Sequence, residues 1–155
     1  MHISERNVGL TLDAALRDLN LAKRKLATEG LSVVIVRLGR IMFTSRASGV
    51  RSLVDAIKEH GPSLAGASIA DKIVGKAAAL LCVYAKISSV YACVMSELGS
   101  EVLKKFSVPF QHEMLVPNIL DRCGTGMCPF ERLVSTIDSP EEAFLAIDRY
   151  SPTKV

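Results

Sequence analysis

Residues 73–95 read IVGKAAALLCVYAKISSVYACVM, and this stretch decides the fold class. From Ile73 to Ala85 nearly every side chain is apolar, with Lys76 as the exception, which is typical of a helix buried at the centre of a domain. Ser89–Met95 is a short, mostly apolar run, and it predicts a buried strand. A buried helix followed closely by a buried strand indicates an α/β protein.

The chain before this stretch predicts a helix, a hairpin and a second helix. Thr11 is suited to cap the first helix and Gly30 to stop it. Ser68 precedes Asp71 by three residues, which is the spacing of a capping box, so we expect the central helix to begin there. The expected elements are a helix with Leu12, Leu16, Leu19 and Leu26 on one side, strands Leu31–Val36 and Ile41–Thr44, and a helix from Ser48-Gly49 to Gly61.

The chain after this stretch continues the alternation of helices and strands. Cys128 is expected to cap a helix with Pro129 at its first position, and Ser139 to cap the last helix. The expected elements are helix Glu97–Phe106, strand Phe110–Val116, a helix with Phe130, Leu133, Val134 and Ile137 on one side, and the helix after Ser139. The order α-β-β-α-α-β-α-β-α-α requires crossovers and predicts a mixed sheet covered by helices.

Composition indicates a single globular domain over residues 1–155. Hydrophobic residues make up 49% and charged residues 23%, and no linker interrupts the chain. The 19 Lys and Arg residues are dispersed among 16 Asp and Glu residues, which argues against nucleic acid as a partner. Aromatic residues are only 5%, with no Trp, so a base-stacking platform is not expected.

Neither a membrane segment nor a secretory leader is expected. The longest apolar stretch, Ala77–Ala85, falls short of the roughly 18 residues that a spanning helix needs. The first residues lack a charged segment followed by an apolar one. We therefore expect a cytoplasmic protein in which all four cysteines are reduced thiols.

Cys128 is the residue of the sequence that most clearly suggests a reactive side chain. A thiol at a helix start faces free backbone N–H groups and the positive end of the helix dipole, which favours the thiolate. Arg122 upstream adds positive charge, and Glu131 is placed either to close a capping box on the Cys128 backbone or to carry a proton. Cys128 and Glu131 are therefore the candidate catalytic residues. The alternative is that Cys128 packs as a small apolar cap.

Metal or cofactor binding is not expected. Four residues separate Cys123 from Cys128, which is not the spacing of a redox or zinc pair, and no second Cys/His pair completes four ligands. The histidines His2, His60 and His112 stand alone and receive no role.

Lysines near the expected central helix start suggest an anion site. Lys72 and Lys76 would share one helix face, where positive charge opposes the dipole unless an anion lies nearby. Gly75 would allow backbone or a ligand to approach closely. The alternative is that the lysines extend to solvent or that one pairs with a carboxylate.

Three segments together resemble a known prokaryotic family. They are Asp71-Lys72-Ile73-Val74-Gly75-Lys76-Ala77-Ala78-Ala79, Val94-Met95-Ser96-Glu97, and Arg122 with Gly124-Thr125-Gly126-Met127-Cys128-Pro129-Phe130-Glu131. On these motifs the chain is similar to the family called domain of unknown function 1893. The resemblance implies a cytidine-deaminase-like fold, a three-layer α/β/α sandwich around a mixed sheet.

The resemblance does not carry deaminase chemistry with it. Such deaminases hold zinc with a His or Cys beside a catalytic Glu and with two cysteines of a Pro-Cys-x-x-Cys motif. This chain has Val74-Gly75-Lys76 and Ser96-Glu97-Leu98-Gly99 where we expect those motifs. Without zinc ligands the fold does not transfer the reaction.

Three functions remain open from the sequence. The first is a domain that binds a small anionic or nucleoside-like ligand, with Asp71, Lys76, Ser96, Arg122 and Thr125 as the lining residues. The second is a cysteine-dependent hydrolase or transferase that uses Cys128. The third is a protein-interaction or accessory module. Whether the chain forms a homo-oligomer is also left open.

Overall fold

The computed structural model describes residues 5–47 and 49–150, with side chains from Leu12 onward. The expectations for His2, for Ser48 and for the Thr11 side chain therefore lie outside the described part. The elements are α1 (Glu5–Thr28), β1 (Val33–Arg37), β2 (Arg40–Ser45), α2 (Arg51–His60), a short 3-10 helix (Gly61–Leu64), β3 (Ser68–Val74), α3 (Lys76–Tyr84), β4 (Ser89–Ser96), α4 (Glu97–Lys105), β5 (Phe110–Val116), α5 (Pro129–Leu133) and α6 (Pro140–Arg149).

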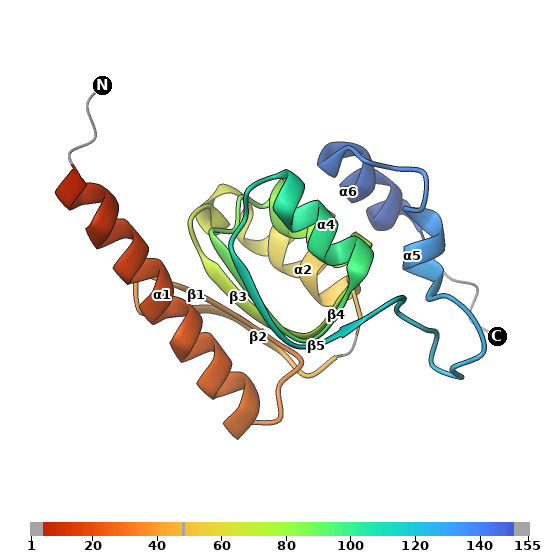
Figure 1. Cartoon of the computed structure of the whole chain (residues 1–155), viewed down its shortest axis with the longest axis horizontal. Coiled ribbons are helices and arrows are strands. Elements are labelled where there is room, and N and C mark those ends of the chain that lie inside the picture. Colours follow the sequence, from red (N-terminus) through yellow and green to blue (C-terminus); the bar gives the residue numbers. More distant parts are fainter. Residues whose placement is uncertain (1–4, 48, 151–155) are drawn as a thin grey trace.

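The five strands form one mixed sheet in the order β2-β1-β3-β4-β5 (Figure 1). Strand β1 is antiparallel to both β2 and β3, whereas β3, β4 and β5 are parallel to one another. The carboxyl ends of β3 and β4 therefore meet at one edge of the sheet, and each leads directly into a helix. This arrangement confirms the predicted α/β class and mixed sheet.

Helices cover both faces of the sheet (Figure 1). Helix α1 covers one face, and α2, α3 and α4 cover the other, with α5 and α6 packed against α3. Because β1 is covered on both faces, all of Val33–Val36 is buried. The smaller core, under α1, includes Leu19, Leu26, Val34 and Tyr91; the larger core includes Ile35, Leu53, Ile69, Leu80 and Leu103.

Residues 68–74 form strand β3, so the prediction that the central helix begins at Ser68 is wrong. The Ser68 hydroxyl donates to the Ala15 carbonyl of α1 at 3.1 Å and lies 2.7 Å from the Ser89 hydroxyl on β4. Pairing with β1 on one side and β4 on the other stabilises the extended backbone over the local capping pattern. The sheet consequently gains a strand, and Lys72 lies on β3 instead of sharing a helix face with Lys76.

Two other helices differ from the prediction. Helix α1 already includes Glu5, so Thr11 lies inside it and is not its cap, and Leu12 and Leu16 are 61% and 50% exposed. Helix α5 ends at Leu133 after five residues. The hairpin, α4, β4, β5 and α6 lie close to where the sequence predicts them.

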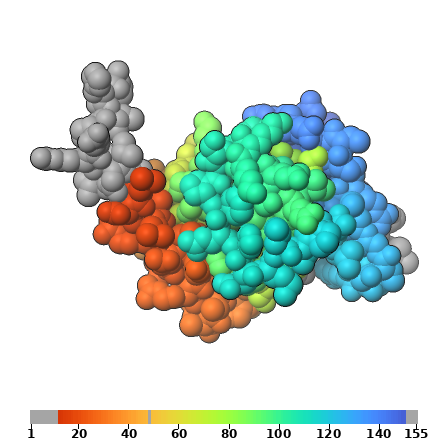
Figure 2. Space-filling view, viewed as in Figure 1, coloured from red at the N-terminus to blue at the C-terminus, as the bar shows by residue number. Residues whose placement is uncertain are grey.

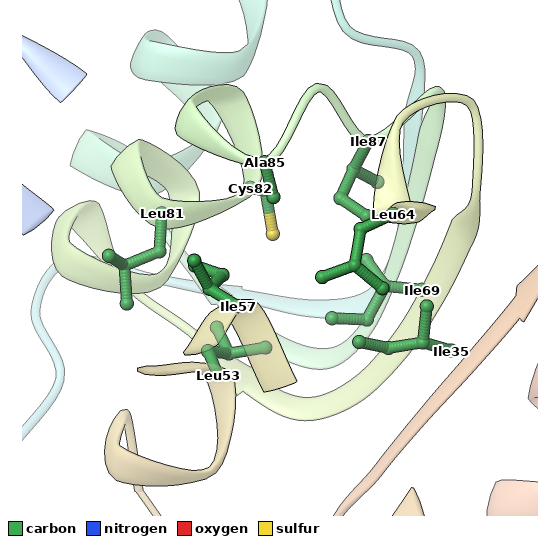
Figure 3. Close-up of a pocket in the computed structure, with 9 residues that line it drawn as sticks. All are labelled: Ile35, Leu53, Ile57, Leu64, Ile69, Leu81, Cys82, Ala85 and Ile87. Carbon is green, nitrogen blue, oxygen red and sulfur yellow. The ribbon is translucent and has the colours of Figure 1, made fainter. Parts of the chain in front are cut away.

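A small apolar cavity lies in the larger core (Figure 3). Its volume is about 10 Å³, and Figure 3 shows the Cys82 thiol from α3 among the apolar side chains of α2, β1 and β3. A cavity of this size and lining holds at most one water molecule and takes no ligand. A wider, open groove lies between the end of α1 and β2 and is lined by Leu21, Arg24, Lys25, Thr28, Glu29 and Ile41, none of them a candidate from the sequence.

Candidate functional site

At the carboxyl edge of the sheet, backbone and side chains pack closely around the turn between β3 and α3. Gly75 links the two elements with an extended backbone, φ −101° and ψ −167°. A Cβ added at Gly75 would overlap the Glu131 carboxylate, and one added at Gly99 of α4 would lie 3.0 Å from the Gly75 carbonyl carbon and oxygen. Two glycines therefore allow α4 and Glu131 to approach the start of α3, as the sequence predicts for Gly75.

Glu131 occupies the N-terminus of α3. Its Oε1 accepts a hydrogen bond from the Lys76 backbone N–H at 2.7 Å, and its Oε2 accepts one from the Ala77 N–H at 2.8 Å. These N–H groups have no partner within the helix, and the helix dipole is positive at this end, so both effects stabilise a carboxylate. The N-terminus of α3 thus binds an oxyanion, and the oxyanion belongs to the protein itself.

The surroundings of Glu131 have opposing effects on the pKa of its carboxyl group. Burial raises the pKa of the Glu131 carboxyl above its usual value, while the N–H groups of Ala77 and Lys76 and the Lys76 charge lower it. Burial outweighs the other causes, so the net direction is upward. The two hydrogen bonds therefore compensate only part of the cost of removing this carboxylate from water.

Lys76 is buried, and its ammonium group is already paired. The Lys76 Nζ lies 3.1 Å from Asp138 Oδ1 and donates to the Ser135 carbonyl at 3.3 Å. The Lys76 side chain is 10% exposed, whereas that of Asp138 is 78% exposed. The alternative in which one lysine pairs with a carboxylate therefore describes Lys76. A largely exposed carboxylate is a partner that Lys76 can exchange at low cost.

Ser96 stands at the end of β4, beside the same turn. It is buried, and its hydroxyl accepts a hydrogen bond from the Gly99 N–H at 3.0 Å, which caps α4. Gly99 is also the residue that contacts Gly75. Ser96 therefore supports the turn from within, with its hydroxyl engaged in capping.

Asp71 lies on β3, before the turn, and shares no hydrogen bond with Glu131 or Lys76 in the described part of the chain. Burial raises the pKa of Asp71 to about 7, against smaller lowering effects from the N–H groups of Ile73 and Lys72. Burial, and secondarily the Asp71 charge, raises the pKa of the Cys82 thiol on α3. Asp71 is thus a partly desolvated acid between β3 and α3.

Arg122 and Thr125 belong to a separate, exposed loop. Asp121 closes this loop because its Oδ1 accepts from the Thr125 N–H at 3.0 Å and its backbone N–H donates to Gly126 at 2.8 Å. The hydrogen bond from the Thr125 backbone lowers the pKa of Asp121. Arg122 is exposed, and in the described part of the chain it shares no hydrogen bond with Lys76 or Glu131. The structure therefore leaves both residues apart from Lys76.

Cys128 occupies the N-cap position of α5, but its side chain does not cap the helix. Its backbone N–H donates to the Ile119 carbonyl at 3.0 Å, and its thiol makes no capping hydrogen bond. Glu131 turns to α3 instead, so the predicted capping box between Glu131 and the Cys128 backbone is wrong. A five-residue helix also offers little dipole, and the nucleophile role of Cys128 stays a hypothesis.

The structure gathers three of the seven candidate residues, Lys76, Ser96 and Glu131, around the Gly75 turn. Asp138 and Gly99, which also contribute to this turn, are not among those candidates. No local pattern connects Asp138 with Lys76, because 62 residues separate them. Gly99 carries a weak signal, as a glycine in the first turn of a helix is costly unless something packs closely against it.

The donor atoms around this turn do not fit the zinc of the deaminases. The start of α3 presents backbone N–H groups, which repel a cation, and Glu131 already uses both carboxylate oxygens. Among the described side chains, those of residues 12–47 and 49–150, no three His, Cys, Asp or Glu residues gather as a ligand set. The residues present therefore do not support zinc chemistry at this turn.

Comparison with known proteins places the chain beside proteins of one family. The family model described as domain of unknown function (DUF1893) matches residues 21–150. The crystal structure of a DUF1893 family protein from Thermotoga maritima is similar, with 29% sequence identity, a TM-score of 0.78, and coverage of 96% of this chain and 93% of that chain. No curated protein matches. Among the described helices, none has the length and apolar character to cross a membrane.

Proposed function

We propose that this chain, which belongs to the DUF1893 family, binds a small anionic ligand at the N-terminus of α3 in exchange for the Glu131 carboxylate. The observation that carries the proposal is that two backbone N–H groups already hold a carboxylate there, 2.7 and 2.8 Å away. A ligand carboxylate or phosphate also presents negatively charged oxygens that can accept hydrogen bonds from these donors.

The segment that carries Glu131 is suited to release it. Glu131 lies on a five-residue helix, and most residues of the preceding stretch, 117–128, are exposed. Few buried contacts therefore hold residues 117–128 in place, whereas Phe130 and Leu133 of α5 pack against the larger core. Burial raises the pKa of Glu131, so this carboxylate is a poorly compensated occupant that a ligand with additional contacts can replace.

Lys76 supplies the second element of recognition. Its ammonium group reaches the same end of α3 and is paired with the 78% exposed Asp138. Transfer of Lys76 from Asp138 to a ligand phosphate would leave Asp138 in water, where a free carboxylate is stable. Charge-assisted contacts of this kind favour a doubly charged phosphate over a neutral ligand.

We also propose a cytidine-deaminase-like fold for the family, which would make a nucleoside phosphate the preferred ligand. The five-stranded mixed sheet between two helix layers supports this assignment. The proposal excludes zinc-dependent deamination, because the donor set at the turn does not suit zinc. Its nucleoside part rests on the analogy of fold.

Amide NMR shifts during titration with inorganic phosphate and with adenosine monophosphate test the proposal. In the wild-type chain, the Lys76 and Ala77 amides should shift, because their N–H groups change partner. The Glu131→Ala variant should bind about tenfold more tightly, because no internal carboxylate competes. Glu142→Ala, which removes an exposed carboxylate from α6, is the matched control and should bind like the wild type.

Loss of the Lys76 charge should have the opposite effect on phosphate affinity from loss of the Glu131 carboxylate. Lys76→Met should weaken phosphate binding in both the wild-type and the Glu131→Ala background. If the Lys76 and Ala77 amides stay unmoved in both the wild-type chain and Glu131→Ala, the N-terminus of α3 binds no anion and the proposal is wrong. If they shift only in Glu131→Ala, Glu131 is a permanent helix cap and the proposal is equally wrong.

A further inference from the structure

Strand β5 forms an edge of the sheet that lacks the usual protection against pairing. In the described part of the chain its outer side pairs with no other strand, since β5 is last in the order β2-β1-β3-β4-β5. Its seven residues, Phe110–Val116, include no Lys, Arg or Pro, and its register with β4 shows no bulge. The opposite edge, β2, begins with Arg40 and pairs with a register shift between Ile35 and Val36. The one Asp or Glu of β5, Glu113, accepts a hydrogen bond from the Tyr91 hydroxyl of β4 at 2.9 Å. An edge strand without lysine, arginine, proline or a bulge is open to pairing with another strand.

Exposed apolar side chains surround this edge. Met114 and Leu115 lie on opposite faces of β5 and are 58% and 46% exposed. Leu98 in the first turn of α4 and Phe106 just after its end are 42% and 37% exposed. Figure 2 shows residues of α4 and β5 together on one face of the molecule. An edge strand flanked by apolar side chains is typical of an interface.

From these features we propose that a second copy of this chain pairs with β5 through β5 of its own, antiparallel, to form one continuous sheet across a two-fold axis. A two-fold axis perpendicular to the sheet reverses the direction of the second strand, so two copies of one strand meet in antiparallel register. Every copy uses the same surface, and the contact closes as a dimer.

Under this symmetry, the charges on α4 of one copy complement the charges on α4 of the other. The exposed residues of α4 form one stripe, with Glu97, Leu98 and Glu101 toward its start and Lys104 and Lys105 at its end. The two-fold axis sets the α4 helices antiparallel. The acidic start of each α4 then faces the basic end of the other, which favours a second copy over an unrelated partner.

The spacing of the elements also suits this dimer. Helix α4 packs on both β4 and β5, so its axis lies about midway between strands that are about 4.8 Å apart. Adding β5 of a second copy at the same spacing places the two α4 axes about 10 Å apart, within the distance at which helices pack. Backbone pairing of the strands and side-chain packing of the helices are therefore satisfied together.

Sedimentation velocity on the full chain tests the proposal. The wild-type chain should sediment with twice the mass of one chain. Met114→Lys, which adds a charge to the edge, should halve that mass. Leu145→Lys is the matched control, because Leu145 is a 51% exposed leucine on α6, and this variant should remain a dimer. Circular dichroism checks that both variants are folded.

A charge exchange tests the pairing of the α4 helices independently of β5. Glu101→Lys should weaken the dimer, and the double variant Glu101→Lys with Lys104→Glu should restore it. A monomeric wild-type chain at every concentration would overturn the proposal. So would a Met114→Lys variant that stays a dimer, or a wild-type monomer that captures an added β-strand peptide in place of a second copy. The proposal does not depend on anion binding at α3, because Met114 and Glu101 lie on β5 and α4 and take no part in the hydrogen bonds of Glu131 and Lys76 described above.

Discussion

Glu131 Oε1 lies 2.7 Å from the Lys76 backbone nitrogen, so a carboxylate on α5 caps a helix that begins 55 residues earlier in the chain. The contact joins the last part of the chain to the carboxyl edge of the parallel strands. It also fills the position at which a free helix N-terminus would attract an anion. The proposed function therefore couples stability and anion binding at one carboxylate.

The first prediction concerns the stability that this contact provides. Glu131→Ala removes two hydrogen bonds from the start of α3 and should lower the free energy of unfolding by about 2–3 kcal/mol. Glu131→Gln keeps one acceptor oxygen but turns an NH₂ group toward the second backbone N–H, so it should also destabilise. Urea unfolding measures both changes, with Glu142→Ala as a control that should stay within about 0.5 kcal/mol of the wild type. Equal stability of Glu131→Ala and the wild type would contradict the capping role.

The second prediction concerns Gly75. A Cβ at this position overlaps the Glu131 carboxylate, so Gly75→Ala should displace Glu131 and destabilise the protein by about 2 kcal/mol. Because both substitutions disrupt the same contact, the double variant Gly75→Ala with Glu131→Ala should cost clearly less than the sum of the single variants. A double-mutant cycle from urea unfolding provides the measurement. Additive costs would mean that Gly75 is needed for another reason, such as its contact with Gly99.

Local sequence patterns predict the elements whose signals do not conflict. Ser139 caps α6 as predicted, since its hydroxyl accepts from the Glu142 N–H at 3.3 Å, and β4 and β5 lie close to where the sequence predicts them. Ser68–Val74 is different, because it contains both a capping-box spacing and residues suited to a strand. Pairing with β1 and β4, which lie elsewhere in the sequence, decides in favour of the strand.

The candidate site is predictable only in part, for a related reason. Lys76, Gly75 and Glu131 are recognisable as residues suited to an anion site or a helix start. Their actual relation depends on how α5 packs on α3, and no pattern within either segment encodes a bond across 55 residues. The sequence therefore indicates an oxyanion site, while only the fold shows that Glu131 is the oxyanion.

The third prediction ranks the thiols. Cys123 is exposed and Cys128 partly exposed, whereas Cys82 is buried and burial raises the pKa of its thiol. In the native protein, iodoacetamide should therefore label Cys123 first, Cys128 more slowly and Cys82 only after unfolding. Mass spectrometry of digested samples at successive times gives the order. Faster labelling of Cys128 than of Cys123 would indicate an activated thiol and favour a cysteine-dependent enzyme.

The fourth prediction concerns the pH dependence of stability, which Asp71 should dominate. Its pKa is about 7 in the folded chain, against about 3.9 in an unfolded one. Between these values the unfolded state loses its proton while the folded state keeps it, so stability should fall as the pH rises from about 4 to 7. Below about pH 4 both states are protonated, and Asp71 has no further effect on the slope.

Asp71→Asn isolates this contribution. The amide keeps an oxygen for the Ile73 N–H, which lies 3.1 Å from Asp71 Oδ1, but it carries no charge at any pH. Because Asp71 retains some contact with water, we expect the variant to be about 2 kcal/mol more stable than the wild type at pH 8 and about equal at pH 4. Urea unfolding of both proteins at a series of pH values measures the difference. Burial raises the pKa of Glu131 as well, but that slope is common to both proteins and cancels. Parallel stability curves would show that Asp71 is ionised in the folded chain and holds its charge by a contact with water or with a ligand.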